Sequence, residues 1–325
     1  MTVLRGSAAP PATGVGRRKT VAPHGRPPVS PARGVGRGLV QRLGPVLWVA
    51  PAAVVILFVF GYSIFQLVFT SFRYQGNWVG FENFALVVSD PLFQTAILHN
   101  TLLLLAVPVL VFLALGVAIL LFECRRSVVV YRAILFLPYI IPIPVIGVVF
   151  GQLLQLNGAF NGALDGLGIG ALTQDWLGNP QLALITMGGV IVWKEVGFGI
   201  VLFLARMLSL PEDVYEAAKL DGVGFFRMHW SMTLPQVRPL INFYLISEAI
   251  VMVSWVFNYV FVMTNGQGGP GNATVVSELY IYNTAFQSKA PELASAAALL
   301  LFVATLVLII GFFRTQKAGG GTLGD

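Results

Sequence analysis

Three ionisable residues lie inside long apolar runs of the chain, where charged groups are costly and usually face a cavity or a partner helix. Lys194 and Glu195 are neighbours near the middle of one run, and Glu248 lies in the next. Trp255 and Tyr259 follow Glu248 by seven and eleven residues, which is nearly the same direction on a helix of 3.6 residues per turn. A carboxylate below two aromatic faces would suit a hydroxyl-rich, partly apolar ring, since Trp and Tyr combine a flat apolar face with a polar tip.

Each of these candidates has a structural alternative. Lys194 and Glu195 could form an ion pair or hydrogen bonds inside a helix bundle rather than line a pathway, and aromatic stripes often pack against neighbouring helices. Asn258 and Asn100 are further polar candidates, and the position of Asn100 near a membrane face favours a capping role.

The sequence carries no motif for enzymatic catalysis. No stretch reads Gly-x4-Gly-Lys-Ser/Thr, and the nearest one, Gly14 to Thr20, has the wrong spacing, so a Walker A loop does not bind ATP here. His24, His99 and His229 lack metal-ligand spacing, and the single Cys124 excludes a disulfide framework. We therefore expect a chain that is not an enzyme and binds no metal or cofactor of its own.

The most structured polar stretch, Ser209 to Pro239, separates two apolar runs. Ser209 is a candidate N-cap, with a proline just inside the helix start and acidic residues in the first turn. The pattern predicts a short helix through Leu220 that stops at Asp221-Gly222, since glycine suits the left-handed C-terminal position. Ala217 and Ala218 keep this helix thin enough to enter a cleft on a partner.

A second short segment, Phe225 to Thr233, is amphipathic and aromatic, as expected of a helix at a membrane surface. We expect Leu234-Pro235 and Pro239 to end it before the next apolar run.

The composition is that of a membrane protein. The 325 residues are 56% hydrophobic and 10% charged, whereas soluble proteins carry about 25% charged residues. The mean hydropathy is +0.80. Six apolar runs reach the roughly 20 residues that cross a bilayer, at about 45–69, 97–122, 133–154, 182–207, 240–263 and 293–313. The sequence predicts an all-α integral membrane fold with six transmembrane helices in a domain over 45–315.

The remaining segments are a basic tail over 1–44, predicted to be disordered because it has almost no large apolar residues, and a short tail over 316–325. Seventeen of the twenty Lys and Arg residues fall in the tails and alternate loops, against Arg73 and Lys289 on the other side. The positive-inside rule therefore places both termini and the 209–239 loop in the cytoplasm. A charge distributed in this way does not indicate nucleic-acid binding.

The polar loop also carries a family resemblance. Glu216-Ala217-Ala218, three residues, Gly222, nine residues, Met232, one residue and Leu234-Pro235 resemble the EAA signature of permease subunits of binding-protein-dependent ABC importers. The family usually has isoleucine in place of Met232. The resemblance implies the type I importer permease fold, in which this loop docks into a groove of the ATP-binding subunit. The implied coupling residues are Glu216, Ala217, Ala218, Asp221, Gly222, Leu234 and Pro235.

Other stretches resemble the carbohydrate-uptake branch of that family, namely Leu137 to Pro142, Trp193-Lys194-Glu195 and Gly268-Gly269-Pro270. The last of these is a candidate docking site for an extracytoplasmic solute-binding protein, or only a turn. The resemblance covers the chain from about Pro45 onward.

The resemblance implies a sugar importer of the bacterial cell membrane that works by alternating access. Its expected partners are a second homologous permease, two ATP-binding subunits that hold ATP and Mg, the binding protein and membrane lipid. Three alternatives remain. They are an importer of glycerol phosphate or another polyol derivative, an ion-coupled secondary transporter, which predicts inverted repeats and broken helices, and a membrane receptor or scaffold.

Overall fold

A computed structural model describes residues 37–124 and 128–318, with side chains over 48–124 and 129–314. The chain divides into one unit that ends at Phe58 and a second that starts at Val59 and contains all the sites discussed below. The predicted tail over 1–44 lies mostly outside the described residues, and the first helix begins within it, at Arg37. The predicted tail over 316–325 is described only to Ala318, where the last helix ends.

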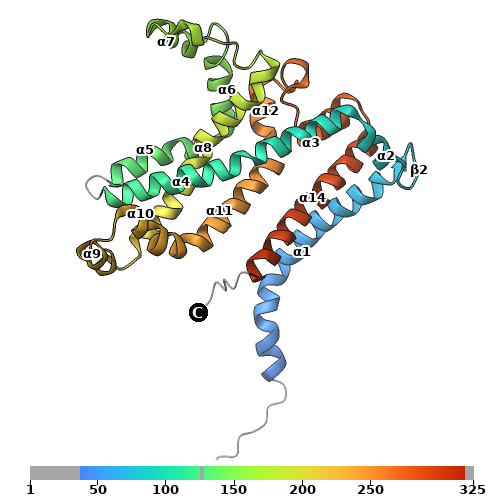
Figure 1. Cartoon of the computed structure of the whole chain (residues 1–325). Helices are drawn as coiled ribbons and strands as arrows, with labels where there is room; N and C mark the ends of the chain where they lie inside the picture. Colours follow the sequence, from blue (N-terminus) through green and yellow to red (C-terminus); the bar gives the residue numbers. More distant parts are fainter. Residues whose placement is uncertain (1–36, 125–127, 319–325) are drawn as a thin grey trace, which may run out of the picture. The chain divides into compact units, whose positions relative to one another are not determined.

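The described residues are mostly helical (Figure 1). The elements are α1 (Arg37–Ser71), β1 (Arg73–Tyr74), β2 (Asn77–Trp78), α2 (Glu82–Ser89), α3 (Pro91–Leu104), α4 (Ala106–Glu123), α5 (Val128–Ile140), α6 (Ile143–Leu153), α7 (Ala159–Gly166), η1 (Gly170–Leu172), α8 (Pro180–Leu208), α9 (Glu212–Leu220), α10 (Phe225–Met228), η2 (His229–Thr233), α11 (Leu234–Ser254), α12 (Phe257–Met263), η3 (Pro270–Asn272), α13 (Ser277–Tyr282), η4 (Asn283–Gln287) and α14 (Pro291–Ala318). The two short strands pair antiparallel, with Arg73 opposite Trp78.

Five helical stretches of the described chain are long and apolar enough to cross a membrane, and one bent helix pair makes a sixth. The five are Trp48–Ser71, Pro91–Glu123, Pro180–Leu208, Phe225–Ser254 and Pro291–Arg314. The predicted all-α membrane fold is confirmed.

The third span, predicted as one helix over about 133–154, is a bent pair of helices. Val129–Ile140 and Ile143–Leu153 meet at 89°. The bend falls at Pro142, which precedes α6 with φ −57° and ψ 136°. Proline has no N–H to continue the helix and disfavours helical backbone at Ile141 before it.

The fifth span is also broken where the sequence predicted one helix to Met263. Trp255 leaves helical geometry with φ −133° and ψ −7°, and α12 starts at Phe257. The Phe257 N–H donates to Glu278 Oε2 at 3.0 Å instead of continuing the helical ladder. A carboxylate at a helix N-terminus is favourable, so Glu278 stabilises the break.

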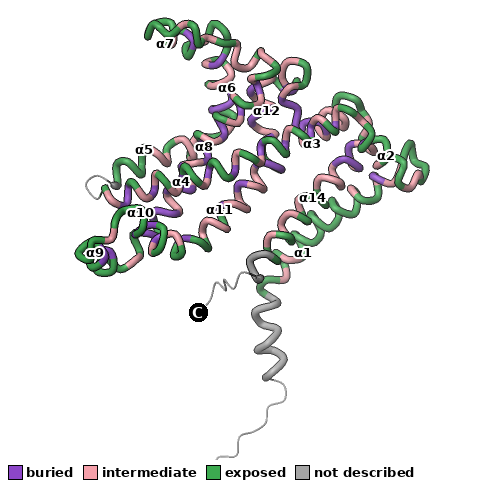
Figure 2. The backbone as a smooth tube through the Cα atoms, viewed as in Figure 1, coloured by how far each residue is buried: buried purple, intermediate pink, exposed green. Residues whose placement is uncertain are grey.

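Helix α8 lies at the centre of the packing, against α4, α5 and α11, and holds many of the buried residues (Figure 2). Gly197 and Gly199 bring the neighbouring helices close. A Cβ at Gly197 would clash with the Leu135 carbonyl on α5, and one at Gly199 would lie 2.5 Å from Tyr244 Cζ on α11. Small residues permit such close approach between membrane helices.

Hydrogen bonds of one buried side chain connect α3 to the end of α11 and to the start of α13. Asn100 is buried within α3, where its amide donates to Met252 O at 3.0 Å and its Oδ1 accepts from Ser277 N at 2.8 Å. From its place within α3 it therefore caps the first N–H of α13 and a carbonyl in the last turn of α11, in agreement with the predicted capping role.

The loop over 209–239 differs from the prediction at both ends. The N-cap of α9 is Pro211, whereas Ser209 ends α8 and its hydroxyl donates to Arg206 O at 2.7 Å. The predicted end is confirmed, because α9 stops at Leu220 and Gly222 has φ +72°.

The second segment of the loop does not end before the next span. α10, the π-turn η2 and α11 run on without a break, and Pro235 and Pro239 lie inside the helix. Leu234 N–H donates to His229 O, five residues back, so the hydrogen-bond register shifts directly before Pro235. The shift falls where the proline has no N–H to offer, which explains why the helix continues.

Candidate functional site

The ionisable residues of the spans form a buried cluster between α5, α8, α11 and α12. Lys194 Nζ lies 3.4 Å from Glu195 Oε1 and donates to Tyr139 O at 3.2 Å. Tyr259 OH donates to the same Glu195 oxygen at 2.7 Å, and Tyr244 OH donates to Glu195 O at 3.1 Å. Lys194 and Glu195 thus form an ion pair that is hydrogen-bonded to neighbouring helices inside the bundle, whereas the buried Glu248 Oε2 has no hydrogen-bond partner. A role of these residues in the substrate pathway stays a prediction.

The predicted stripe of Glu248, Trp255 and Tyr259 does not exist. Glu248 and Tyr259 are buried, whereas the Trp255 side chain is 57% exposed. The break after Ser254 changes the helix direction between these residues, so spacing at 3.6 residues per turn no longer applies. Asn258 is half-buried on α12.

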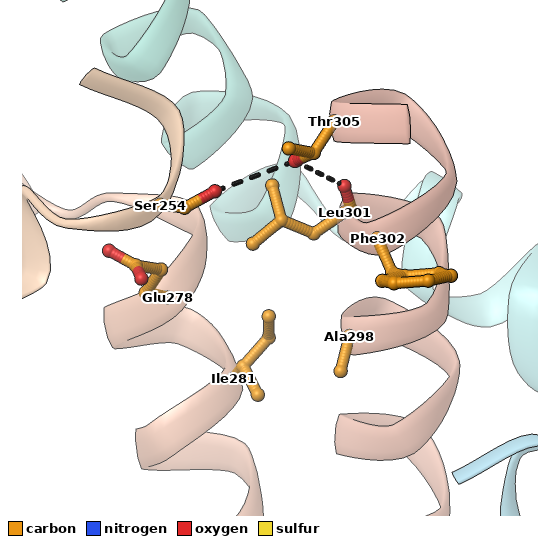
Figure 3. A pocket seen from close by; sticks show the side chains of 7 residues that line it. All are labelled: Ser254, Glu278, Ile281, Ala298, Leu301, Phe302 and Thr305. Atoms are coloured by element: carbon orange, nitrogen blue, oxygen red, sulfur yellow. Dashed lines mark hydrogen bonds between the residues drawn. The ribbon is translucent and has the colours of Figure 1, made fainter. Parts of the chain in front are cut away.

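A cavity of about 370 Å³ lies nearby, between the end of α11, α13 and α14 (Figure 3). Its walls are mainly apolar, with three polar side chains among them; the lining residues are Ser254, Glu278, Ile281, Ala298, Leu301, Phe302 and Thr305. Ser254 Oγ and Thr305 Oγ1 lie 3.5 Å apart on opposite walls. Apolar walls with a few convergent polar groups are typical of small-molecule sites.

Glu278 supplies the one carboxyl group among the residues that line this cavity. Burial raises the pKa of Glu278 to about 7, partly offset by the hydrogen bond from Phe257 N. The sequence analysis missed Ser254, Glu278 and Thr305. Glu278 in the apolar stretch Val275-Val276-Ser277-Glu278-Leu279 was the available signal.

The α9 helix presents two different faces. Glu216 and Ala217 are exposed, and Leu220 is 90% exposed at the end of the helix. Tyr215 and Ala218 are buried against the rest of the chain. Of the two alanines, therefore, only Ala217 lies on the free face, which corrects the expectation that both thin the helix for a partner.

The other residues of the EAA signature follow the same division. Asp221, Gly222 and Pro235 are exposed, and Leu234 is half-buried. Met232, which stands where the family has isoleucine, is half-buried and packs against the hydrophobic core.

The inner face of α9 is held by contacts that the sequence analysis did not find. Tyr215 OH lies 3.0 Å from Thr233 Oγ1, which also lies 3.0 Å from His229 Nδ1. Lys219 Nζ donates to Glu123 Oε2 at 2.8 Å. Glu123 is about a hundred residues away in sequence, so no local pattern links it to the loop.

The segment Gly268-Gly269-Pro270 is a tight turn. Both glycines have positive φ, +73° and +75°, and Thr274 N donates to Gly268 O at 2.9 Å. A Cβ at Gly269 would lie 2.8 Å from Thr274 Oγ1. The turn thus has a structural reason for its glycines, and its role in docking stays a prediction.

Within the described residues, no group of three or more His, Cys, Asp or Glu is placed to hold a metal ion. The long apolar helices define a multi-pass membrane protein, with α9 as a short helix between two of the spans.

Relatives of this chain are permease subunits. The chain is 35% identical over 292 residues to the diacetylchitobiose uptake system permease protein NgcF of Streptomyces coelicolor, covering 85% of this chain and 82% of that protein. It is 31% identical over 290 residues to YurN of Bacillus subtilis, a probable ABC transporter permease, with 85% and 98% coverage. It is 30% identical over 279 residues to the lactose transport system permease protein LacF of Rhizobium radiobacter, with 84% and 93% coverage.

The fold matches as well. A chain in the crystal structure of a bacterial ABC transporter involved in the import of the acidic polysaccharide alginate superposes with a TM-score of 0.77 at 21% identity, over 88% of this chain and 99% of that one. No family model matches the sequence. The chain belongs to the permease subunits of ABC transporters. It is a transport subunit of the bacterial membrane rather than an enzyme, and the recognition made from the EAA signature is confirmed.

Proposed function

We propose that this chain forms part of the transmembrane pathway of an importer for a sugar, driven by ATP hydrolysis on separate subunits. The observation that carries the substrate class is the similarity, at 30% identity or more, to permeases named for diacetylchitobiose and lactose uptake. Family membership decides against the ion-coupled secondary transporter and the receptor or scaffold.

The loop over 209–239 is the proposed coupling element. Its α9 helix has a free face with Glu216 and Ala217 and a second face packed on the bundle. A helix with these two faces can bind a partner and transmit the movement of that partner to the bundle. We assign this loop and both termini to the cytoplasm on the charge asymmetry of the loops. One of two ATP-binding subunits, which carry ATP and Mg, would dock on it, and a second permease would receive the other and complete the pathway. A solute-binding protein would deliver the sugar at the opposite face, where Gly268-Gly269-Pro270 lies.

The cavity between α11, α13 and α14 is the part of the chain best suited to sugar contact. Phe302 and Ile281 supply apolar surface for a ring, while Ser254, Thr305 and Glu278 supply groups that bond hydroxyls. None of its seven lining residues is cationic, so a glycerol phosphate or another anionic polyol derivative finds no charge partner there. Lys194 cannot serve, because it is engaged with Glu195 and Tyr139.

Two substitutions test the sugar contact. Thr305→Val and Ser254→Ala each remove one hydroxyl at nearly constant volume. We expect kcat/KM for uptake to fall about fivefold, because a lost hydrogen bond is worth on the order of 1 kcal/mol. Thr101→Val is the matched control, because the Thr101 hydroxyl, like that of Thr305, donates to the carbonyl four residues earlier but lies at an exposed position outside the cavity. Unchanged uptake in both cavity variants would contradict this site while leaving the importer assignment standing.

The importer assignment itself is tested by purification from the native membrane. We expect an ATP-binding protein and a second permease to accompany the chain in mild detergent. Isolation of the chain alone, with sugar uptake unaffected by its deletion, would contradict the proposal.

A further inference from the structure

Glu123 occupies a place that helix electrostatics does not favour. It is the last residue of α4, where the negative end of the helix dipole disfavours a carboxylate. Its two oxygens instead meet two cationic or ionisable groups of the 209–239 loop. Oε2 accepts from Lys219 Nζ at 2.8 Å, and Oε1 lies 3.3 Å from His229 Nε2. The second contact lacks hydrogen-bond alignment, so the Lys219 ion pair is the firm bond at Glu123.

Phe122, the residue before Glu123, also contacts the 209–239 loop. The Phe122 ring packs edge-on against Tyr215, with centroids 5.2 Å apart, and faces the buried His229 ring at 6.5 Å. Tyr215 and His229 in turn share the Thr233 hydroxyl. The last two residues of α4 thus contact both helical segments of the loop, α9 and η2.

We propose that Glu123 is a positioning residue that fastens the coupling loop to α4. When an ATP-binding subunit displaces α9, α4 then moves with it. Because α4 packs against α8, the displacement reaches α8 by this route as well as through the covalent connection at Ser209. The inference rests on the proposed function of the loop.

The ion pair is poorly suited to a purely stabilising role. The Lys219 side chain is 54% exposed and that of Glu123 is 27% exposed, and exposed ion pairs contribute little to folding. The burial of Tyr215 and Ala218 already holds α9 on the bundle. Removing the charges should therefore leave the fold intact and loosen the mechanical link.

The first test measures solute transported per ATP hydrolysed by the assembled importer in proteoliposomes. Glu123→Gln and Lys219→Met should each lower this ratio roughly threefold or more, the scale for residues that modulate coupling between sites. The charge-reversed pair Glu123→Lys with Lys219→Glu should recover much of the loss. Asp165→Asn, which removes an exposed carboxylate from α7, outside the 209–239 loop, is the control and should leave the ratio unchanged.

An unchanged ratio in Glu123→Gln, or an equal loss in Asp165→Asn, would overturn the proposal. So would a charge-reversed pair that is no better than the single variants.

A distance measurement gives a readout independent of uptake. Spin labels at the native Cys124, which is exposed beside Glu123, and at Leu220→Cys report the separation of α4 and α9 in the assembled complex. We expect one narrow distance that stays constant with and without ATP, and a broader one in Glu123→Gln. A broad distribution in the parent complex would overturn the fastening. Absence of any ATP-dependent uptake in the parent would refute the proposed function of the loop. The distance between residues 124 and 220 would still show whether Glu123 fastens α9 to α4.

Discussion

At the level of residues, the Lys194–Glu195 pair shows how a charged neighbour pair in a membrane helix can be structural. Both side chains are nearly inaccessible, and the hydrogen-bond partners of the two residues come from three other helices, α5, α11 and α12. The sequence identified these residues as important but could not decide between a pathway and an ion pair. That choice depends on Tyr139 and Tyr259, which lie far away in the chain.

We predict that Glu195→Ala destabilises the protein by about 3–5 kcal/mol, because it removes the paired carboxylate 3.4 Å from the buried Lys194 ammonium. The double replacement Lys194→Met with Glu195→Leu should be much less costly, since it removes both charges. Thermal unfolding of the detergent-solubilised protein measures both. A Glu195→Ala variant that unfolds normally but fails to transport would instead place the pair on the substrate pathway.

Glu278 should make the stability of the protein depend on pH. Burial raises the pKa of Glu278 from 4.5 to about 7, so the folded state holds its proton more tightly than the unfolded state. The resulting contribution to stability is complete below about pH 4.5 and is lost as the pH rises to about 7, for a total of about 3 kcal/mol. Glu278→Gln should flatten this part of a plot of unfolding temperature against pH. An identical slope in the variant would show that Glu278 is not the group responsible.

At the level of elements, the length of the apolar runs was sufficient to predict the six spans but not the positions at which two of them break. Pro142 was visible in the sequence, yet Pro235 and Pro239 sit inside a continuous helix, so proline alone does not locate a bend. The break at Trp255 depends on Glu278, over twenty residues later, taking the Phe257 N–H. The stripe predicted through Trp255 failed for this reason.

Packing around α8 predicts a strong difference between two glycines of one helix. A Cβ at Gly199 would meet Tyr244 Cζ at 2.5 Å and Ala114 Cβ at 2.7 Å, whereas one at Gly189 would meet no atom within 4 Å. Gly199→Ala should destabilise the protein by about 1–3 kcal/mol through overpacking. Gly189→Ala should be neutral or slightly stabilising. Equal unfolding temperatures for the two variants would contradict this packing of α8 against α4 and α11.

At the level of the whole molecule, composition and the EAA signature predicted the class of protein, because both are properties of sequence alone. The candidate sites were only partly predictable. The exposed Glu216 face of α9 follows from a local pattern, but Glu123 and the cavity at Ser254 and Thr305 arise where distant segments meet. The sugar assignment comes from the relatives and not from the shape of any site.

We propose above all that α9 couples ATP hydrolysis on a partner subunit to the movement of this chain. The most direct measurement is sugar accumulation in proteoliposomes that contain the complete importer with ATP on the side of the 209–239 loop, compared for the parent and Glu216→Ala. We predict ATP-dependent accumulation in the parent and a large loss of both accumulation and sugar-stimulated ATP hydrolysis in the variant, with an unchanged unfolding temperature. Full accumulation by Glu216→Ala, or accumulation without ATP, would contradict the account.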